Sequence, residues 1–409
     1  MVHEHPSELG HRRSVRFLGW LAIVMVGFVV AEVASCIFLF HQRQQYGQLF
    51  YFDIDHYVQG LQPAQLQVHK RAAELRHIWA PDPTLGWRRT PLSTHFFQAS
   101  GTTVHTDRWG ARVIPNAAGP ASIATYGDSF TEGLEVSDAE TWQAYMAYAT
   151  GTRVLNFGVS AYGPDQAVLA LEANLERGIH TPIVILAMIN ENLNRMMNTF
   201  RLFYTYPIDD IVLGFKPIFV HTDSGFEPKS FAPDDITDID AVRRALWAAS
   251  RYDWFYQHRT ERIRFPFSLG AAGFLVRHGL NPVWWPDYSV GLPRARMEYI
   301  LARFYHDSHK YKFTPVFVLL PGSVAELRSR MGNDHPVFSA MAGQSKFPGL
   351  IYIDVVKELS SVHAKMLVAD FTPESYIAIT HPSAQGNQAI ARVIRARLRD
   401  QLAALGVRK

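Results

Sequence analysis

The sequence predicts an α/β fold: a three-layer α/β/α sandwich with a central parallel sheet of about five strands, preceded by one transmembrane helix. Two observations predict it. After residue 121, short continuous apolar runs alternate with helical segments, which is typical of parallel strands covered by helices on both faces. Near the N-terminus, Phe17 to Phe40 form one apolar stretch, long enough to cross a hydrocarbon core of about 30 Å at about 1.5 Å per residue.

The apolar stretch is expected to be an uncleaved membrane anchor. We assign residues 1–14 to a cytoplasmic tail and residues 15–40 to the anchor, because three arginines precede the stretch and only Arg43 follows it closely. This orientation predicts an inner-membrane protein with one span and a periplasmic or extracellular domain. Glu32, the one charge inside the stretch, is expected near the interface.

Cleavage of this segment is the alternative. Cleavable signal peptides have shorter apolar regions followed by small residues. The residues ending at Cys36 also resemble a bacterial lipoprotein cleavage site, but Ile37 to Phe40 remain apolar after the cysteine. The length of the stretch favours the anchor.

The globular part is expected to begin after a linker. Residues 41–120 are assigned to that linker and a small strand-containing region, and residues 121–405 to the α/β domain. Within the domain, an aromatic-rich insertion at about 192–293 is too long for a simple connection. We interpret it as a helical cap beside the expected active site, or as a structural elaboration without a catalytic role. Strands are predicted at 123–126, 153–157, 182–189, 315–320 and 350–355, and helices near 139–149, 165–177, 294–310 and 384–405.

Composition excludes several classes of function. The net charge is +3, and the Lys and Arg residues are scattered without a basic stripe, which argues against nucleic-acid binding. Cys36 is the only cysteine, so an internal disulfide framework and a multi-cysteine metal site are excluded. No HExxH-type spacing occurs, and we expect neither a metal nor a cofactor.

Polar residues gather in four loops at positions that an open parallel sheet uses for binding, the carboxyl ends of its strands. Three loops follow the first three predicted strands, and the fourth lies where the last helix begins. Together they offer a nucleophile, a histidine base and hydrogen-bond donors, which are the groups that acyl transfer requires. The four segments are Gly127 to Gly133 (GDSFTEG), Asn156 to Ser160 (NFGVS), Asn190 to Asn192 (NEN) and His381 to Asn387 (HPSAQGN).

These segments resemble the sequence blocks of the SGNH (GDSL) hydrolases, and the resemblance covers about residues 121–405. It implies a flavodoxin-like sheet, with Ser129 as nucleophile and His381 as base. It also implies an oxyanion hole made by Ser129, Gly158 and Asn190. Upstream, DPTLGW and TDRWGAR (Thr106 to Arg112) are similar to segments of membrane-tethered bacterial members.

Two departures from the family pattern leave alternatives open. The third block has Met188 and Glu191 in place of its usual Gly and Asp, so Asn192 competes with Asn190 as the oxyanion donor; the motif favours Asn190. The last block usually reads Asp-x-x-His, but Ala378 stands at the position of the acid.

An orienting acid normally fixes the tautomer of the base and stabilises its cation. Its absence from the usual place indicates either a Ser-His dyad or a substitute acid, for which Glu374 and Asp370 are the nearest candidates. A third alternative is a domain without activity that only binds its ligand.

The resemblance implies a membrane-anchored serine esterase acting on O-acyl, in particular O-acetyl, groups of a carbohydrate or polysaccharide. A polysaccharide O-acetyltransferase would use the same residues. A non-catalytic glycan-binding or assembly subunit is the alternative from another class. The partners implied are an acylated carbohydrate, the membrane, and a membrane acyltransferase or a polysaccharide-export protein.

Overall fold

The structure is a computed structural model that describes residues 6–45, 54–55, 57–58, 79–98, 100–115, 119–203, 214–233, 238–259, 263–280, 286–343, 346–359 and 371–406. Its core is a five-stranded parallel sheet in the order β11-β10-β7-β5-β6. The strands are β5 (Ala121–Gly127), β6 (Arg153–Gly158), β7 (Ile183–Met188), β10 (Thr314–Leu319) and β11 (Ile351–Asp354). The predicted fold class is confirmed, and the strand order is the flavodoxin-like one.

Helices cover both faces of this sheet because successive side chains of each strand point to opposite sides. In β7, Val184 and Leu186 pack into one apolar core, whereas Ile183 and Ile185 pack into the other. The first face carries α5 (Pro164–Glu176) and α10 (Gly291–Tyr311), and the second carries α4 (Trp142–Thr150), α13 (Val355–Glu358) and α15 (Ala384–Arg397). The helix predicted at 384–405 is in fact two helices, since α16 (Arg399–Ala404) follows a break at Leu398.

Short elements complete the domain at the ends of the strands. They are α3 (Ser129–Glu132), η2 (Asp138–Glu140), α11 (Val324–Arg330), α12 (Pro336–Met341) and η4 (Pro373–Tyr376). Upstream of the domain, β1 (Trp79–Asp82) pairs with β2 (Gly86–Arg89), and β3 (Thr94–Phe97) pairs with β4 (Thr102–His105). Both hairpins are antiparallel.

The upstream segment packs against the loop that follows β6. The indole of Trp87 donates to the carbonyl of Ser160 at 3.1 Å, and the hydroxyl of Tyr162 donates to the carbonyl of Trp87. Gln166 donates to the carbonyl of Leu85 at 2.7 Å. The DPTLGW segment therefore holds the loop at the carboxyl end of β6 in place.

The insertion between β7 and α10 contains small elements and the helix α9. They are α6 (Asn192–Arg195), η3 (Arg201–Phe203), β8 (Ile218–Thr222), β9 (Gly225–Lys229), α7 (Ile239–Ser250), α8 (Trp254–Gln257) and α9 (Phe267–His278). A buried ion pair ties it to the sandwich, because Lys216 Nζ lies 2.6 Å from Asp165 Oδ2 on α5. Trp284 and Trp285, two of the aromatic residues of the insertion, lie outside the described residues.

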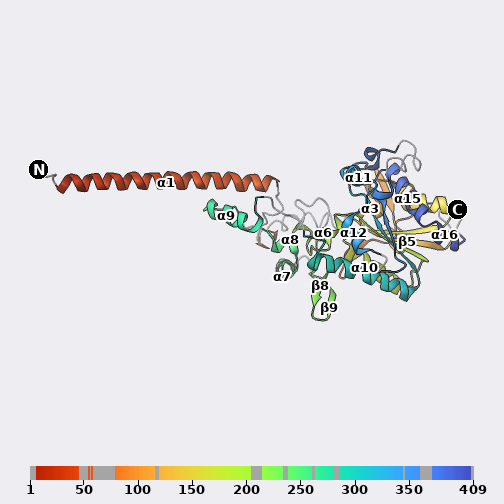
Figure 1. The fold of residues 1–409 in the computed structure, drawn as a ribbon. Helices are drawn as coiled ribbons and strands as arrows, with labels where there is room; N and C mark the ends of the chain where they lie inside the picture. Colours follow the sequence, from red (N-terminus) through yellow and green to blue (C-terminus); the bar gives the residue numbers. More distant parts are fainter. Residues whose placement is uncertain are drawn as a thin grey trace.

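The helix α1 (Pro6–Gln45) extends away from the α/β domain (Figure 1). The most apolar stretch of 18 residues within Phe17–Gln44 has a mean hydropathy of 2.5, so α1 is long and apolar enough to cross a membrane, a criterion that a signal sequence also meets. The helix α9 lies beside the half of α1 nearer to the domain (Figure 1).

Candidate functional site

The candidate site lies at the carboxyl end of β5, next to the point where the strand order reverses. The chain passes from β5 outward to β6 and then returns to β7 on the other side of β5. Open α/β sheets generally bind their ligands at such a reversal. Gly127 closes β5 tightly, because a Cβ there would lie only 2.2 Å from the carbonyl oxygen of Ala187 and from Thr131 Oγ1.

Ser129 is the first residue of the short helix α3. Asp128 caps this helix, since its carboxylate accepts the N–H of Phe130 at 2.9 Å. The Oγ atom of Ser129 lies 2.8 Å from Nε2 of His381, which the last loop brings to the same edge. The ring of Phe130 packs on the imidazole, with their centroids 4.9 Å apart. The structure therefore brings the predicted nucleophile and base into hydrogen-bond contact.

Glu135 lies on the other side of the imidazole. Its Oε1 is 2.9 Å from Nδ1 of His381. The same carboxylate accepts the backbone N–H groups of Ile379 (2.9 Å), Thr380 (3.0 Å) and His381 (3.1 Å), and the hydroxyl of Thr380. Glu135 therefore fixes both the ring and the backbone of the loop that carries it.

These hydrogen bonds keep Glu135 ionised. Burial alone would raise the pKa of this carboxyl, but the hydrogen bonds from His381, Thr380 and Ile379 outweigh burial and hold the pKa well below its usual range. Ser129, His381 and Glu135 thus form a continuous Ser-His-Glu chain with the connectivity of a serine-hydrolase triad.

The candidate acids named from the sequence do not take this position. The carboxylate of Glu374 is bound to the guanidinium of Arg328, and both side chains are largely exposed. Asp370 lies outside the described residues. The expectation that Glu374 orients His381 is therefore wrong. Glu135 was missed because it lies 246 residues from His381, although it follows Ser129 by only six residues.

Gly158 has a packing role that the sequence did not predict. Its N–H donates to Oδ1 of Asn156 at 2.9 Å, so this donor is not free for an oxyanion as the resemblance implied. A Cβ at Gly158 would lie 2.2 Å from the backbone nitrogen of Glu132. The glycine lets α3 approach β6 closely.

Ala161, three residues further on, presents a free backbone N–H. Its φ of +65° lies in the left-handed region, which residues with a Cβ rarely adopt. The residues on both sides are held, since the carbonyl of Ser160 accepts from Trp87 and that of Tyr162 accepts from Asn192. Within the described part of the chain, the N–H of Ala161 has no hydrogen-bond partner. Strained backbone at such a place is typical of functional sites.

The two asparagines after β7 have different environments. Asn192 is buried, and its amide donates to Oδ2 of Asp128 at 3.0 Å and to the carbonyl of Tyr162 at 3.2 Å, while its Oδ1 accepts the N–H of Ile189. Asn190 is exposed, and among the described residues its side chain has no hydrogen-bond partner. Asn192 therefore holds the loops together, and Asn190 remains available to a ligand. Glu191, at the usual Asp position, pairs with Arg195 at 2.5 Å.

We predict that Asn190→Ala lowers ester turnover by about 10²- to 10³-fold, the usual loss for one oxyanion donor. The midpoint of thermal unfolding should stay unchanged, because the side chain holds no other part of the fold. Asn192→Ala is the matched control and should lower that midpoint by leaving buried partners unsatisfied. A normal rate in Asn190→Ala would remove this residue from the site.

Arg112, from the TDRWGAR segment, clamps the loop that carries Glu135. The buried guanidinium donates to the carbonyls of Glu132, Gly133 and Val136, the first and last at 2.8 and 2.6 Å. Its Nε lies 2.8 Å from Oδ1 of Asp138. The residues of this loop on both sides of Glu135 are thereby fixed by one side chain.

We predict that Arg112→Met lowers the midpoint of thermal unfolding by on the order of 10 °C and also reduces ester turnover. Removing one partner of a buried ion pair costs about 3–5 kcal/mol, and each kcal/mol shifts the midpoint by about 2–4 °C at this size. Arg88→Met is the control, since Arg88 is more exposed and lies 3.4 Å from Asp82. Equal midpoints for the two variants would contradict the clamp.

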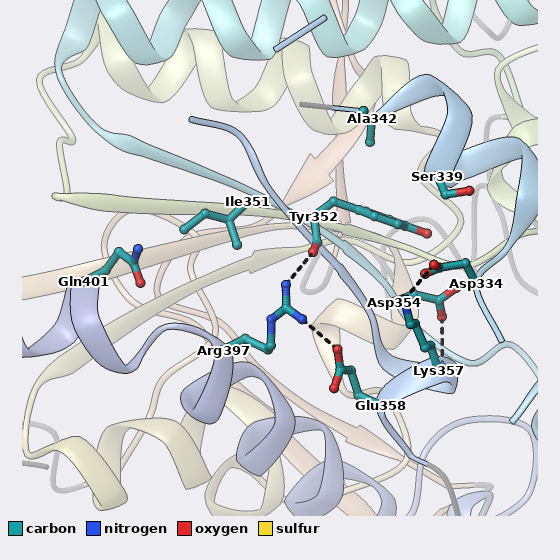
Figure 2. Close-up of a pocket in the computed structure, with 11 residues that line it drawn as sticks. Asp334, Ser339, Ala342, Ile351, Tyr352, Asp354, Lys357, Glu358, Arg397 and Gln401 are labelled. Carbon is teal, nitrogen blue, oxygen red and sulfur yellow. Dashed lines mark hydrogen bonds and ion pairs between the residues drawn. The ribbon is translucent and has the colours of Figure 1, made fainter. Parts of the chain in front are cut away.

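A cavity of about 410 Å³ lies elsewhere, beside the edge strand β11. Figure 2 shows its charged residues paired with one another: Lys357 with Asp334, and Arg397 with Glu358. Asp354 accepts from Arg330 and from the N–H of His335. None of the residues of the Ser-His-Glu chain lines this cavity, so it is not the candidate site.

No protein-family model matches the chain, and no curated protein matches it. Among solved structures, the chain is similar to a protein assigned to the G-D-S-L family of lipolytic proteins from Desulfitobacterium hafniense DCB-2. The alignment covers 68% of this chain and 100% of that chain, with 11% sequence identity and a TM-score of 0.32. A likeness at this level does not indicate an activity for this chain.

Proposed function

We propose that the chain is a membrane-anchored serine esterase that forms an acyl-enzyme at Ser129. The observation that carries this proposal is the hydrogen-bonded chain from Ser129 Oγ through His381 to Glu135, with contacts of 2.8 and 2.9 Å. A serine hydroxyl is a weak nucleophile unless an adjacent base takes its proton. The order of these three groups meets that requirement.

The reaction proceeds in two steps. Ser129 Oγ attacks the ester carbonyl while Nε2 of His381 takes the serine proton, and the ionised Glu135 stabilises the resulting imidazolium. The backbone N–H groups of Ser129 and Ala161 and the side chain of Asn190 donate to the oxyanion. His381 then gives its proton to the departing alcohol, which leaves the acyl group on Ser129. Water, activated by His381, releases the acid and restores the serine.

The substrate class we propose is O-acyl, in particular O-acetyl, groups of a carbohydrate or polysaccharide outside the cytoplasm. Two observations support it. The helix α1 is apolar and long enough to anchor the domain to a membrane, and three arginines precede its apolar part. Among the described residues, no Lys or Arg is hydrogen-bonded to Ser129 or His381, which suits a neutral ester rather than an anionic one.

The test is covalent labelling of the full-length protein in detergent with a fluorophosphonate probe, followed by peptide mass analysis and assays with p-nitrophenyl acetate and an acetylated polysaccharide. We expect the adduct on the peptide that contains Ser129, and acetate release from both substrates. Ser289→Ala, which changes an exposed serine, is the control and should be labelled normally. Absence of an adduct at Ser129 together with no turnover would overturn the proposal in favour of a binding protein. Acetyl transfer to added sugar without acetate release would make the enzyme a transferase.

A further inference from the structure

The helix α9 lies along α1 (Figure 1), and two pairs of aromatic rings show that both helices run in the same direction. The ring of Phe265, just before α9, lies 6.3 Å from that of Phe28, and the ring of Phe274 lies 5.6 Å from that of Phe38. Contacts therefore advance together along both helices. The N-terminal end of α9 is the end farther from the α/β domain, and it lies beside the middle of the apolar part of α1.

The chain reaches α9 and leaves it again at the same end of the helix pair, the end nearer to the α/β domain. Nη1 of Arg277, in the last turn of α9, donates to the carbonyl of Arg259 at 2.8 Å. Residues on the way to α9 and residues at its end are thus neighbours, while Phe265 lies at the opposite end beside Phe28. This is the path of a re-entrant segment, which dips into a bilayer and returns to the same side.

Glu32 of α1 caps the start of α9. Its carboxylate accepts the N–H of Phe267 at 2.5 Å, the N–H of Ser268 at 3.2 Å, and the hydroxyl of Ser268. Glu32 lies eight residues before Phe40, or about 12 Å along the helix, so it is within the apolar span rather than at its interface. Charged side chains inside a span face polar partners, and the free N–H groups of a helix start are such partners.

One face of α9 is apolar and uncovered. The residues from Pro266 to Val276 include no charged side chain, and Leu269 and Val276 are 70% and 89% exposed. The opposite face carries small residues: a Cβ at Gly270 would lie 3.3 Å from Leu39, and Ala271 is buried against α1. Small residues let membrane helices approach one another closely.

We propose that α9 is a second membrane-inserted element, which enters the leaflet on the side of the α/β domain and presents Leu269, Leu275 and Val276 to lipid acyl chains. On α1, Val33 and Ile37 are likewise exposed, at 54% and 65%. Such a surface is unfavourable in water and matches hydrocarbon. Two backbone N–H groups at its deep end, those of Phe267 and Ser268, are satisfied by Glu32. Arg264, the one charged residue between Ile263 and Val276, has an interaction partner.

The test places a nitroxide label at single cysteines of the full-length protein, in a Cys36→Ser background, in phosphatidylcholine vesicles. The labelled variants are Leu269→Cys and Val276→Cys, with Met25→Cys on α1 as the membrane reference and the exposed Ala139→Cys as the aqueous reference. Power saturation compares collisions with oxygen, which concentrates in lipid, and with a nickel chelate, which stays in water. Each variant is used only if its thermal midpoint matches that of the Cys36→Ser protein.

We expect the ratio of oxygen to nickel accessibility to be higher at 269 than at 276, and higher at both than at 139. We expect this order because the two helices run in the same direction, which places residue 269 deeper in the bilayer than residue 276. Greater nickel accessibility at 269 and 276 would place α9 in water and overturn the proposal. Exclusion of both reagents would show that protein, such as a second copy of the chain, covers this face, and would also overturn it. If the ratio at residue 25 were as low as that at residue 139, α1 itself would lie in water, and the proposal for α9 would fall with it.

Discussion

Ser129→Ala is expected to lower the rate of ester cleavage by at least about 10³-fold, and up to about 10⁶-fold, because the nucleophile of the acyl-enzyme is removed. The residual rate reflects binding and the oxyanion donors, which the variant retains. The only side-chain hydrogen bond of Ser129 among the described residues joins its Oγ to His381. Alanine also favours helix, so α3 should form as before.

Initial rates with p-nitrophenyl acetate and thermal unfolding midpoints, measured on the same preparations, check this expectation. The midpoint of Ser129→Ala should match that of the wild type. Ser289→Ala should keep both values. Turnover within tenfold of the wild type in Ser129→Ala would show that another group is the nucleophile.

The fold class could be predicted because the apolar pattern that marks each strand lies within the strand itself. Continuous apolar runs such as Ile183–Met188 read as strands buried on both faces, and the structure confirms a parallel sheet. Ser129 and His381 were also predictable as members of one site, since both lie in polar loops that adjoin the sheet. Their contact at 2.8 Å agrees with the roles expected for them, and those roles remain a proposal.

The other parts of the site depend on contacts between distant segments. The position of Glu135 beside His381 results from the docking of the last loop onto the turn after α3, which Arg112 clamps from a third segment. Nothing in the spacing of these residues encodes that docking. The bond from Gly158 to Asn156 and the positive φ of Ala161 are likewise features of folded backbone. The short distance along the chain from Ser129 to Glu135 was the one available signal.

The identity of the acid beside His381 is therefore the point at which the structure differs most from the expectation from the sequence. The variant Glu135→Gln tests the role of this acid. We expect turnover to fall by about 10⁴-fold, because a neutral amide does not stabilise the imidazolium that forms when His381 takes the serine proton. Glutamine has nearly the same shape, and its Oε1 still accepts backbone N–H groups of residues 379–381. The loss should therefore appear in kcat, with little change in KM.

The pH dependence separates this role from a structural one. Hydrogen bonds hold the pKa of Glu135 below its unfolded value, so its carboxylate stabilises the fold above that value, and the stabilisation is lost as the pH falls through the folded pKa. At neutral pH the wild-type carboxylate is fully ionised. Its removal takes away the anion beside His381, so the maximum rate should fall at neutral pH, and the stability difference from the wild type should shrink as the pH falls.

Glu374→Gln is the matched control, because it makes the same chemical change in a carboxylate that is bound to Arg328 on the surface. Its rate and its pH–rate profile should equal those of the wild type. The reverse pattern, with a slow Glu374→Gln and a normal Glu135→Gln, would restore the acid expected from the sequence. If both variants keep the wild-type rate and profile, Ser129 and His381 act as a dyad, and the bonds from Glu135 to residues 379–381 serve only to hold the loop in place.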